Sequence, residues 1–365
     1  MRSLLQHLTD SLAGGREVLL CQVIETKGST PQKAGSIMLV DPQGGQVGTL
    51  GGGCVENEVK QRAIQLIGTG RSEFNSFILD HDYAWADGLI CGGKMVILSQ
   101  SLRGLDPAGY FRHYRDLLDN GQGFTELVKV DSPKGGDFAP GSRFLFDEKG
   151  EIIANYPHAD APASYRDLLQ PLSERPARRV REGVAILPTL PRIRLIVVGA
   201  GHVGQAVAEL ASRADFDVWA VDDRRQYANA ERFPSAERII VGPIDDLFPS
   251  VEVDDRSYVV IATRGHGHDQ EALAHFVKTP ASYVGLIGSR RKITMIFNEL
   301  REMGIPQETL DRVAAPVGLD IGSESVAEIA VSIVAELIGR RNLGPSAVIP
   351  RHFNPPRRRP STSAG

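Results

Sequence analysis

The sequence is poor in cysteine. It contains only three, Cys21, Cys54 and Cys91, and no two of them have the CxxC spacing of zinc ribbons or redox pairs. An odd number without that spacing argues against a disulfide framework and against a zinc ribbon. We therefore expect the protein to reside in a reducing compartment, the cytoplasm.

Aromatic residues, net charge and long apolar runs are also scarce. Aromatic side chains make up 6% of the sequence, which is too few for a surface that stacks nucleic-acid bases. The formal charge of -4 gives no general attraction to nucleic acid or to an anionic membrane. No segment approaches the roughly 20 apolar residues that span a bilayer, and the first ten residues lack the apolar core of a signal peptide. We expect neither nucleic acid nor a membrane as a partner.

The chain is long enough for two hydrophobic cores. Its 365 residues exceed the size at which one core usually divides. The predicted elements place an α+β domain at residues 1–156 and a second domain at 192–343. Residues 157–191 are rich in Pro, Ala and Arg and are interpreted as a linker that can include a short helix and an edge strand. The Pro- and Arg-rich tail, 344–365, cannot bury a core and is expected to be disordered.

The first domain is expected to mix helices and strands. An amphipathic helix opens the chain, and a second helix is predicted over Val55–Gly68, where Val59, Ala63 and Ile67 repeat at four-residue spacing. Apolar runs bounded by turn residues predict the strands Glu17–Thr26, Ser36–Val40, Phe74–Leu79, Lys94–Ser99 and Leu127–Val130, followed by a hairpin over 144–154.

The second domain alternates strands with helices. The predicted strands are Leu195–Val198, Asp217–Val221, Arg238–Val241, Tyr258–Ala262 and Tyr283–Ile287. The predicted helices are His202–Arg213, Asp269–Val277, Arg290–Met303 and Glu324–Gly339. Such alternation is typical of a parallel sheet covered on both faces. The expected fold class is therefore α/β, a Rossmann-type doubly wound parallel sheet that follows a separate α+β domain.

A glycine-rich turn, Gly199-Ala-Gly-His-Val-Gly204, joins the first of these strands to a helix. In this pattern Gly199 permits a tight bend, Gly201 lets the backbone approach a pyrophosphate, and Gly204 lets helix and strand pack closely. The helix that begins at His202 offers N–H groups and a partial positive charge to an anion. The pattern favours nucleotide or phosphate binding, and a turn kept only for packing is the alternative.

An acidic residue stands at the end of the next strand, which is the position where a nucleotide-binding turn of this kind has one. Asp222 stands 23 residues after Gly199 and could accept hydrogen bonds from a ribose diol, while repelling a 2′-phosphate. Asp223 and Arg224 follow directly, so the acidic role could belong to the neighbouring residue. Both residues would lie at the carboxyl edge of the sheet, where ligands of parallel sheets bind.

Two histidines follow the fourth strand of the second domain at the same edge. His266 and His268, beside Asp269, could ligate a metal or act as acid–base groups. Alternatively, Asp269 caps the following helix and the imidazoles only line the loop. No further cysteine or carboxylate cluster stands near them in the sequence, so the structural interpretation is favoured over metal binding.

A glycine triplet precedes Cys54 at the predicted start of a helix. Successive glycine N–H groups can surround an oxyanion, and the helix dipole lowers the pKa of a thiol at this position and so favours the thiolate. Cys91 stands beside two more glycines. The two cysteines are candidates for one pocket and for a soft metal, against an equally weighted alternative of small residues in tight turns. Cys21 lies in an apolar strand and is expected to be buried.

These segments together resemble the xanthine dehydrogenase accessory proteins of the XdhC/CoxI type. The resemblance lies in residues 23–31 (VIETKGSTP), 48–56 (GTLGGGCVE), 91–93, 199–204, 221–224, 263–266, 285–292, 316–322 and 328–333. It covers both domains in order and nearly the whole chain, so it is far more specific than any one motif.

The resemblance implies a chaperone of molybdenum cofactor rather than an enzyme. Such proteins bind the molybdopterin form, support exchange of an oxo for a sulfido ligand by a cysteine desulfurase, and deliver the cofactor to an apo xanthine dehydrogenase-type molybdoenzyme. Molybdopterin carries a phosphate, or a pyrophosphate and nucleoside in its dinucleotide forms. Arg290 and Arg291, beside the fifth strand of the second domain, are suited to phosphate oxygens.

Two other functions stay open on the sequence alone. One is an NAD-dependent oxidoreductase in which Asp222 binds the adenosine ribose and His266 transfers a proton. The other is an adaptor whose second domain is only a scaffold. A homodimer would suit symmetric delivery. The candidate metal ligands are Cys54 and Cys91, and the candidate cofactor-binding residues are Gly51, Gly52, Gly53, Cys54, Cys91, Gly199, Gly201, His202, Gly204, Asp222, His266, Arg290 and Arg291.

Overall fold

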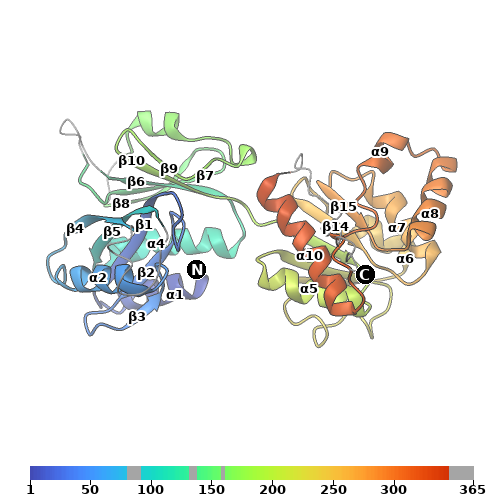
Figure 1. Cartoon of the computed structure of the whole chain (residues 1–365), viewed down its shortest axis with the longest axis horizontal. Helices are drawn as coiled ribbons and strands as arrows, with labels where there is room; N and C mark the ends of the chain where they lie inside the picture. Colours follow the sequence, from blue (N-terminus) through green and yellow to red (C-terminus); the bar gives the residue numbers. More distant parts are fainter. Residues whose placement is uncertain (80–91, 131–137, 158–160, 345–365) are drawn as a thin grey trace, which may run out of the picture. The chain divides into compact units, whose positions relative to one another are not determined.

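The computed structural model describes residues 1–79, 92–130, 138–157 and 161–344, and it divides into two units, Met1–Pro191 and Arg192–Gly365 (Figure 1). Cys91 lies outside the described residues, and so do residues 345–365 of the segment 344–365 that is expected to be disordered. Each unit has its own sheets and its own hydrophobic clusters. The two units therefore have separate hydrophobic cores.

Unit 1 opens with helix α1 (Arg2–Ala13) and an antiparallel sheet of order β3-β2-β1-β5-β4. The strands are β1 (Val18–Lys27), β2 (Ile37–Val40), β3 (Gln46–Gly48), β4 (Ser72–Ile78) and β5 (Lys94–Leu102). The central strand β1 is buried on both faces. Leu20 packs with α1, whereas Leu19 and Cys21 pack with helix α2 (Gly53–Ile64) in a different cluster. The strand period of two thus divides its apolar residues between two cores.

A second antiparallel sheet of unit 1 has the order β8-β7-β6-β10-β9. Its strands are β6 (Phe124–Lys129), β7 (Arg143–Asp147), β8 (Ile152–Tyr156), β9 (Arg179–Arg181) and β10 (Val184–Thr189). Helix α4 (Leu105–Asp119) precedes it, and the rings of Tyr110, Phe111 and Tyr114 pack in the same cluster as α1. The predicted β7–β8 hairpin is confirmed.

Residues 157–191 are more ordered than a linker. They contain two short 3-10 helices, Ala163–Leu168 and Leu172–Glu174, as well as β9 and β10. The expected edge strand is β9, and β10 lies inside the sheet, because it pairs with β6 on one side and with β9 on the other. Its first five residues are buried, and burial of this apolar run outweighs the proline- and arginine-rich surroundings that suggested a connection.

A buried polar cluster connects the two sheets of unit 1. The Arg143 guanidinium, with 0% of its side chain exposed, donates to the side-chain amide oxygens of Gln22 (2.7 Å) and Gln100 (2.9 Å) and to the carboxylate of Glu126 (2.8 Å). Glu126 also accepts from the Gln22 amide (2.9 Å) and the Tyr110 hydroxyl (3.0 Å). Because a buried charge is tolerated only when it is paired and hydrogen-bonded, this cluster specifies how the two sheets pack together.

Unit 2 contains a parallel sheet of order β13-β12-β11-β14-β15, which confirms the predicted Rossmann-type sheet. Its strands are β11 (Arg194–Val198), β12 (Asp217–Asp222), β13 (Arg238–Val241), β14 (Ser257–Ile261) and β15 (Tyr283–Leu286). Along β11, Leu195 and Val197 face one hydrophobic cluster, and Ile196 and Val198 face the other. Both faces of the sheet are therefore covered.

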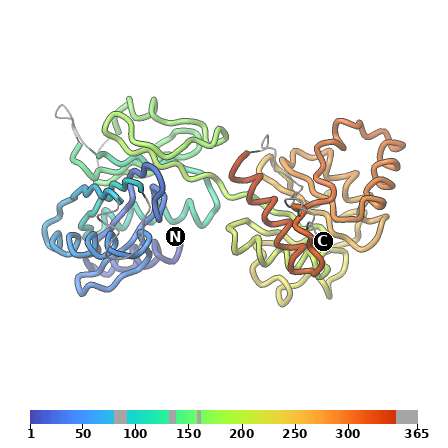
Figure 2. The backbone as a smooth tube through the Cα atoms, viewed as in Figure 1, coloured from blue at the N-terminus to red at the C-terminus, as the bar shows by residue number. Residues whose placement is uncertain are grey.

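Helices cover the two faces of this sheet, as Figures 1 and 2 show. Helices α5 (His202–Arg213) and α10 (Val326–Leu343) pack on one face. Helices α6 (Ile244–Leu247), α7 (His266–Phe276), α8 (Arg290–Glu302) and α9 (Gln307–Asp311) pack on the other. The loops that follow β11, β12, β14 and β15 share the carboxyl edge of the sheet. Among the described residues, no helix has both the length and the apolar character needed to span a bilayer.

Candidate functional site

Three glycine-containing segments of unit 1 form one loop cluster, residues 28–31, 51–53 and 92–93. A Cβ on Gly93 would collide with the carbonyl oxygen of Ser29, and a Cβ on Gly51 would collide with the ring of Pro31. Only glycine permits these two contacts. The turn at 28–31 therefore touches both of the other segments, although they lie far apart in the sequence.

The glycine triplet adopts a backbone that other residues avoid. Gly51, Gly52 and Gly53 have φ values of +114°, +76° and +72°, all in the left-handed region that favours glycine. Nothing lies within 4 Å of a Cβ built on Gly52, so this residue is required for its backbone conformation and not for close packing. The triplet leads directly into helix α2.

The carboxylate of Glu56 binds the backbone at the glycine triplet. Its carboxylate accepts from the backbone amides of Leu50 (2.7 Å) and Gly52 (3.0 Å), and from the side chains of Thr49 and Gln46 (both 2.6 Å). Burial acts to raise the pKa of Glu56, but these hydrogen bonds outweigh it and the pKa is lowered. In this structure the amides of Leu50 and Gly52 thus bond an anion of the chain itself, so of the glycine triplet the Gly52 amide is not available to an external oxyanion.

Cys54 is the second residue of α2 and is half-buried. It lies in the first turn, next to the positive end of the helix dipole. Cys91 lies outside the described residues, although the next residue, Gly92, belongs to the loop cluster. Cys21 is different: burial raises the pKa of its thiol to about 12, despite a hydrogen bond with Ser99. Cys21 is thus a core residue, as expected.

The glycine turn of unit 2 divides into packed and open positions. A Cβ on Gly199, at φ +112°, would collide with the backbone of Ala262, and a Cβ on Gly204 would collide with the carbonyl oxygen of Gly199. Gly201 differs, because nothing lies within 4 Å of a Cβ built there, and the adjacent His202 is exposed at the start of α5. The surface at Gly201 is therefore the part of the turn that a phosphate can reach.

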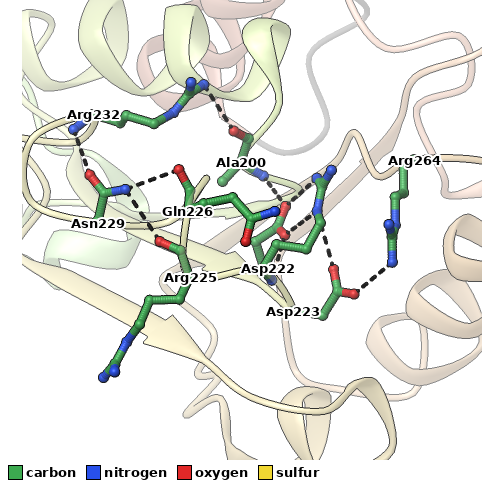
Figure 3. Close-up of polar contacts among 9 residues, drawn as sticks. Ala200, Asp222, Asp223, Arg225, Gln226, Asn229, Arg232 and Arg264 are labelled. Atoms are coloured by element: carbon green, nitrogen blue, oxygen red, sulfur yellow. Dashed lines mark hydrogen bonds and ion pairs between the residues drawn. The ribbon is translucent and has the colours of Figure 1, made fainter.

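Asp222 binds the turn itself. Its carboxylate accepts from the amide of Ala200 (2.7 Å), from the amide and Nε of Arg224 (both 2.9 Å) and from Nη2 of Arg224 (3.0 Å), as Figure 3 shows in part. Burial acts to raise the pKa of Asp222, but these hydrogen bonds outweigh it and the pKa is lowered. Four donors fill the acceptor sites of a carboxylate. The expectation that Asp222 accepts from a ribose diol therefore does not fit this geometry.

A second arginine binds the other backbone polar group of the same residue, Ala200. Arg232 donates to the carbonyl oxygen of Ala200 (3.3 Å) (Figure 3). The guanidinium groups of Arg224 and Arg232 lie 4.0 and 5.2 Å from the ring centroid of Tyr227. The segment that follows β12 thus fixes the residue between Gly199 and Gly201, and it provides a rigid backbone for the turn.

The acid next to Asp222 has a different environment. Asp223 accepts from Nη2 of Arg264 at 2.9 Å and lies 3.6 Å from Nε of Arg224 (Figure 3). Arg264 follows β14, so this ion pair joins the loops at the ends of two strands that are not neighbours in the sheet. The Arg264 side chain is 55% exposed. The pair therefore spans the carboxyl edge of the sheet beside the glycine turn.

The two histidines do not come together as metal ligands. His266 Nε2 lies 2.6 Å from a carboxylate oxygen of Glu299 on α8, whereas His268 Nδ1 lies 3.7 Å from Glu271 on its own helix. In the parts of the chain that the structure describes, no three His, Cys, Asp or Glu side chains are close enough to hold a metal ion. The histidines thus stay candidates for hydrogen bonding or proton transfer only.

Asp269, in the first turn of α7, is a structural residue. Its completely buried carboxylate accepts from the amide (3.0 Å) and hydroxyl (2.5 Å) of Thr263 and pairs with the ammonium group of Lys292. Asp269 therefore ties the loop after β14 to helix α8. The expectation that it caps the following helix is wrong, because α7 begins at His266 after Gly265 and no side chain caps it. Arg290 and Arg291 begin α8 and are exposed, in a position where phosphate oxygens could approach them.

Three residues that shape these sites were given no site role from the sequence: Glu56, Arg232 and Arg264. Glu56 stands four residues after Gly52, and a carboxylate in the first turn of a helix is a signal for capping by the side chain. No local pattern identifies Arg232 or Arg264, because each bonds a residue that is more than 30 positions away.

Comparison with known sequences identifies two domain families in the chain. A sequence model described as the XdhC and CoxI family matches residues 11–79. A second model, described as the XdhC Rossmann domain, matches residues 195–337. The first match includes the turn at 28–31, the glycine triplet and Cys54, and the second includes the whole parallel sheet. The site of unit 2 and two of the three segments of the loop cluster therefore lie within matched regions.

Three similar proteins cover nearly the whole chain. A protein of Bacillus subtilis, named as a probable xanthine dehydrogenase subunit, is 29% identical over 89% of this chain and 93% of its own length. The molybdenum cofactor insertion chaperone PaoD of Escherichia coli is 22% identical over 93% of this chain and 88% of its own. A crystal structure described as a xanthine dehydrogenase from Bacillus halodurans has a TM-score of 0.74 and 25% identity over 91% and 94% of the two chains.

Proposed function

We propose that this chain, which belongs to the XdhC and CoxI family, is an accessory factor that binds molybdenum cofactor, supports its sulfuration and inserts it into a xanthine dehydrogenase-type molybdoenzyme. The family match in both units and a relative named as a molybdenum cofactor insertion chaperone support this role. The cofactor is then the cargo of the protein, and the chain itself need not catalyse a redox reaction.

The observation that carries the proposal is the loop cluster of unit 1. Three separate segments pack there through positions where only glycine fits, and the triplet leads directly to Cys54 in the first turn of α2. A half-buried cysteine at a helix start, beside a surface with few side chains, combines a thiol suited to a soft metal with access for a bulky ligand. We therefore assign the metal end of the cofactor to Cys54, with Cys91 as the second candidate ligand.

Glu56 affects which end of the cofactor the loop cluster can accept. Its carboxylate already fills the amides of Leu50 and Gly52, and a negative charge at this position repels a phosphate. The loop cluster is therefore poorly suited to a phosphate. Unit 2, taken by itself, offers a phosphate the open Gly201 and His202 and the positive charge of the exposed Arg290 and Arg291. Arginine recognises phosphate oxygens through paired hydrogen bonds.

The proposal implies two protein partners. A cysteine desulfurase would supply the sulfur that replaces an oxo ligand, and an apo xanthine dehydrogenase-type enzyme would receive the finished cofactor. A homodimer of this chain would suit delivery to a symmetric client. The cofactor form, molybdopterin or a dinucleotide, follows from the client enzyme.

Metal and pterin analysis of the purified full-length protein tests the proposal. The protein is expressed in cells that make molybdenum cofactor and in matched cells that cannot. Molybdenum is then measured by mass spectrometry, and the pterin by the fluorescence of its oxidation product. We expect molybdenum and pterin in equal amounts from the first cells and neither from the second.

The alternative function predicts a different result in the same samples. An NAD-dependent oxidoreductase would contain no molybdenum from either cell type, and it would bind NADH and oxidise it in the presence of substrate. That result would refute the proposed function and support the oxidoreductase. The four hydrogen bonds of Asp222 count against this alternative, because the residue expected to bind the adenosine ribose is already occupied.

A further inference from the structure

A second pocket of unit 1 lies between helix α1 and the β2–β3 hairpin, which are neighbours in Figure 1. Its volume is about 480 Å³, within the range of roughly 300 to 1,000 Å³ that is usual for small-molecule sites. The residues that line it come from α1, from the turn before β1 and from the hairpin, whereas the loop cluster is built from residues 28–31, 51–53 and 92–93. This pocket is therefore a separate candidate site.

Part of the lining is apolar. Val18, Leu39 and Val47 line the pocket, and all three belong to or pack against the hydrophobic cluster that α1 forms with the sheet. A surface of this kind is suited to an aliphatic or aromatic group of a ligand, because apolar area that leaves water there gains free energy.

Charged residues of both signs line the same pocket without pairing. Arg16 and Glu17 lie in the turn between α1 and β1, and Asp41 directly follows β2. None of these three side chains forms an ion pair with any residue that the structure describes. Opposite charges attract, so a lining that holds them unpaired offers both signs to a ligand.

The two carboxylates are each held through one oxygen. Asp41 Oδ1 accepts from two backbone amides of its own turn, at 2.9 and 2.7 Å. Glu17 Oε1 accepts from the amide of Gly68 (2.7 Å) and from the Ser101 hydroxyl. The second oxygen of each carboxylate accepts no hydrogen bond from the described part of the chain and is not buried. Both second oxygens are therefore accessible acceptors on side chains that are already fixed.

The guanidinium of Arg16 is held in a similar way. Its Nη2 donates to the hydroxyl of the buried Ser11 (3.1 Å), and the backbone amide of Arg16 donates to the Ser11 carbonyl oxygen (2.9 Å). A guanidinium carries several further N–H donors, and two of them can bind a carboxylate side by side. Arg16 is therefore an anchored donor for an anionic group.

We infer that this pocket binds a free amino acid with an apolar side chain. The ammonium group bonds the second oxygens of Asp41 and Glu17, the carboxylate bonds Arg16, and the side chain lies on Val18 and Leu39. Each charged group of the ligand then meets an opposite charge. An uncharged ligand would instead cover the charges of the lining without compensating them, which is unfavourable.

This inference goes beyond the proposed function and does not depend on it. The pocket nevertheless adjoins the loop cluster through one residue. Gln46 lines the pocket, and its side chain donates to Glu56 (2.6 Å), the residue that binds the glycine triplet. A ligand in the pocket therefore lies beside a residue that supports the conformation of the loop before Cys54.

Calorimetric titration of the full-length protein, purified from cells that make no molybdenum cofactor, tests the inference. The probes are leucine, valine, methionine and phenylalanine, followed by the N-acetyl and amide derivatives of the one that binds most tightly. We expect at least one of these amino acids to bind at millimolar concentration or below. Each derivative should bind about tenfold more weakly, because it has lost a charge that a hydrogen bond in the pocket needs.

Two variants separate the two ends of the ligand. Arg16→Gln should weaken the amino acid about tenfold and leave its amide derivative nearly unchanged. Asp41→Asn should weaken the amino acid about tenfold and leave its N-acetyl derivative nearly unchanged. Asp147→Asn is the matched control, because Asp147 accepts from two backbone amides of the β7–β8 turn in the same way as Asp41 does in its own turn. It should bind as wild type does.

Two results would overturn the inference. The first is that none of the four amino acids binds at millimolar concentration. The second is binding that neither the Arg16 nor the Asp41 variant alters. Because the titration uses protein without molybdenum cofactor, either result leaves the cargo role to be decided by the metal analysis, and a failure of the cargo role leaves the amino-acid titration unaffected.

Discussion

The carboxylate of Glu56 accepts a hydrogen bond from the backbone amide of Gly52 at 3.0 Å, so the glycine triplet is bound by an anion from its own helix. Three further donors complete the arrangement, from Leu50, Thr49 and Gln46. The loop is thus held in one conformation before any ligand arrives. Its function in the proposed site is to present Cys54 and not to hold a phosphate.

Glu56→Gln should destabilise unit 1 in a pH-dependent way. Although burial acts to raise its pKa, the hydrogen bonds lower the pKa of Glu56 below its ordinary value of 4.5. A carboxyl with a lowered folded pKa stabilises the fold above its unfolded pKa, and this contribution is lost as the pH falls through the folded value. The variant should lose about 1 to 2 kcal/mol at pH 7, and the difference should shrink below about pH 4.5.

Urea unfolding at pH 7 and at lower pH measures this difference. Glu58→Gln is the matched control, because Glu58 lies on the same helix in an exposed pair with Arg62. It should change stability by less than about 1 kcal/mol at either pH. A Glu56→Gln effect that is the same at both pH values would show that the charge of Glu56 is not what stabilises the loop.

Cys54→Ala should reduce the molybdenum content of protein from cofactor-making cells severalfold while leaving the fold intact. The reason is that Cys54 is half-buried at the start of α2, where a thiol can reach a bound metal. Cys21→Ala is the comparison, since Cys21 is buried in β1 and should lower stability without changing the metal content per folded chain. Unchanged molybdenum in the Cys54 variant would remove the thiolate-ligand assignment.

Gly204→Ala should lower the stability of unit 2, whereas Gly201→Ala should leave its stability unchanged and affect binding instead. A Cβ on Gly204 collides with the carbonyl oxygen of Gly199, so the variant should lose about 1 to 3 kcal/mol in thermal unfolding of unit 2. Gly201 has a φ of −68° and open space around a Cβ, so its variant should unfold as wild type does. The effect of Gly201→Ala should appear in binding, because the added methyl group lies where a phosphate would approach the turn. Equal unfolding of the two variants would contradict the division of the turn into packed and open positions.

Arg143→Met should be among the most destabilising substitutions in unit 1. It leaves the buried Glu126 without its cationic partner, and breaking a buried pair costs about 3 to 5 kcal/mol. Arg166→Met removes the exposed pair with Glu151 and should cost less than about 1 kcal/mol. Calorimetry on both variants measures the contrast. A loss of similar size in both would mean that the buried cluster does not determine how the sheets pack.

Much of the parallel sheet of unit 2 could be predicted from sequence. Its five strands are short apolar runs buried on both faces, and each predicted boundary lies within about two residues of the observed one. The glycine turn was also predictable, because backbone sterics alone dictate glycine at Gly199 and Gly204. These features depend on the conformation of neighbouring residues in the chain, which is what a sequence pattern can predict.

The features that could not be predicted depend on distant partners. Asp222 lies at the predicted strand end, but its hydrogen bonds to Ala200 and Arg224 decide that it holds the turn instead of a ribose. Likewise, the composition around β10 indicates a linker, whereas pairing with β6, more than 50 residues earlier, places it inside a sheet. Spacing gives the position of a side chain on its element, and the tertiary structure decides which partner it meets.

The position of β10 determines where this chain can be divided. Residues 190–193 are all that separate β10 from β11, and Ile193 already belongs to the core of unit 2. A gene fragment that ends at residue 156 would leave β6 as an exposed edge strand with unpaired backbone groups, which is a template for aggregation. A fragment that ends at Pro191 keeps the sheet complete, so attempts to express the halves separately should divide the chain there.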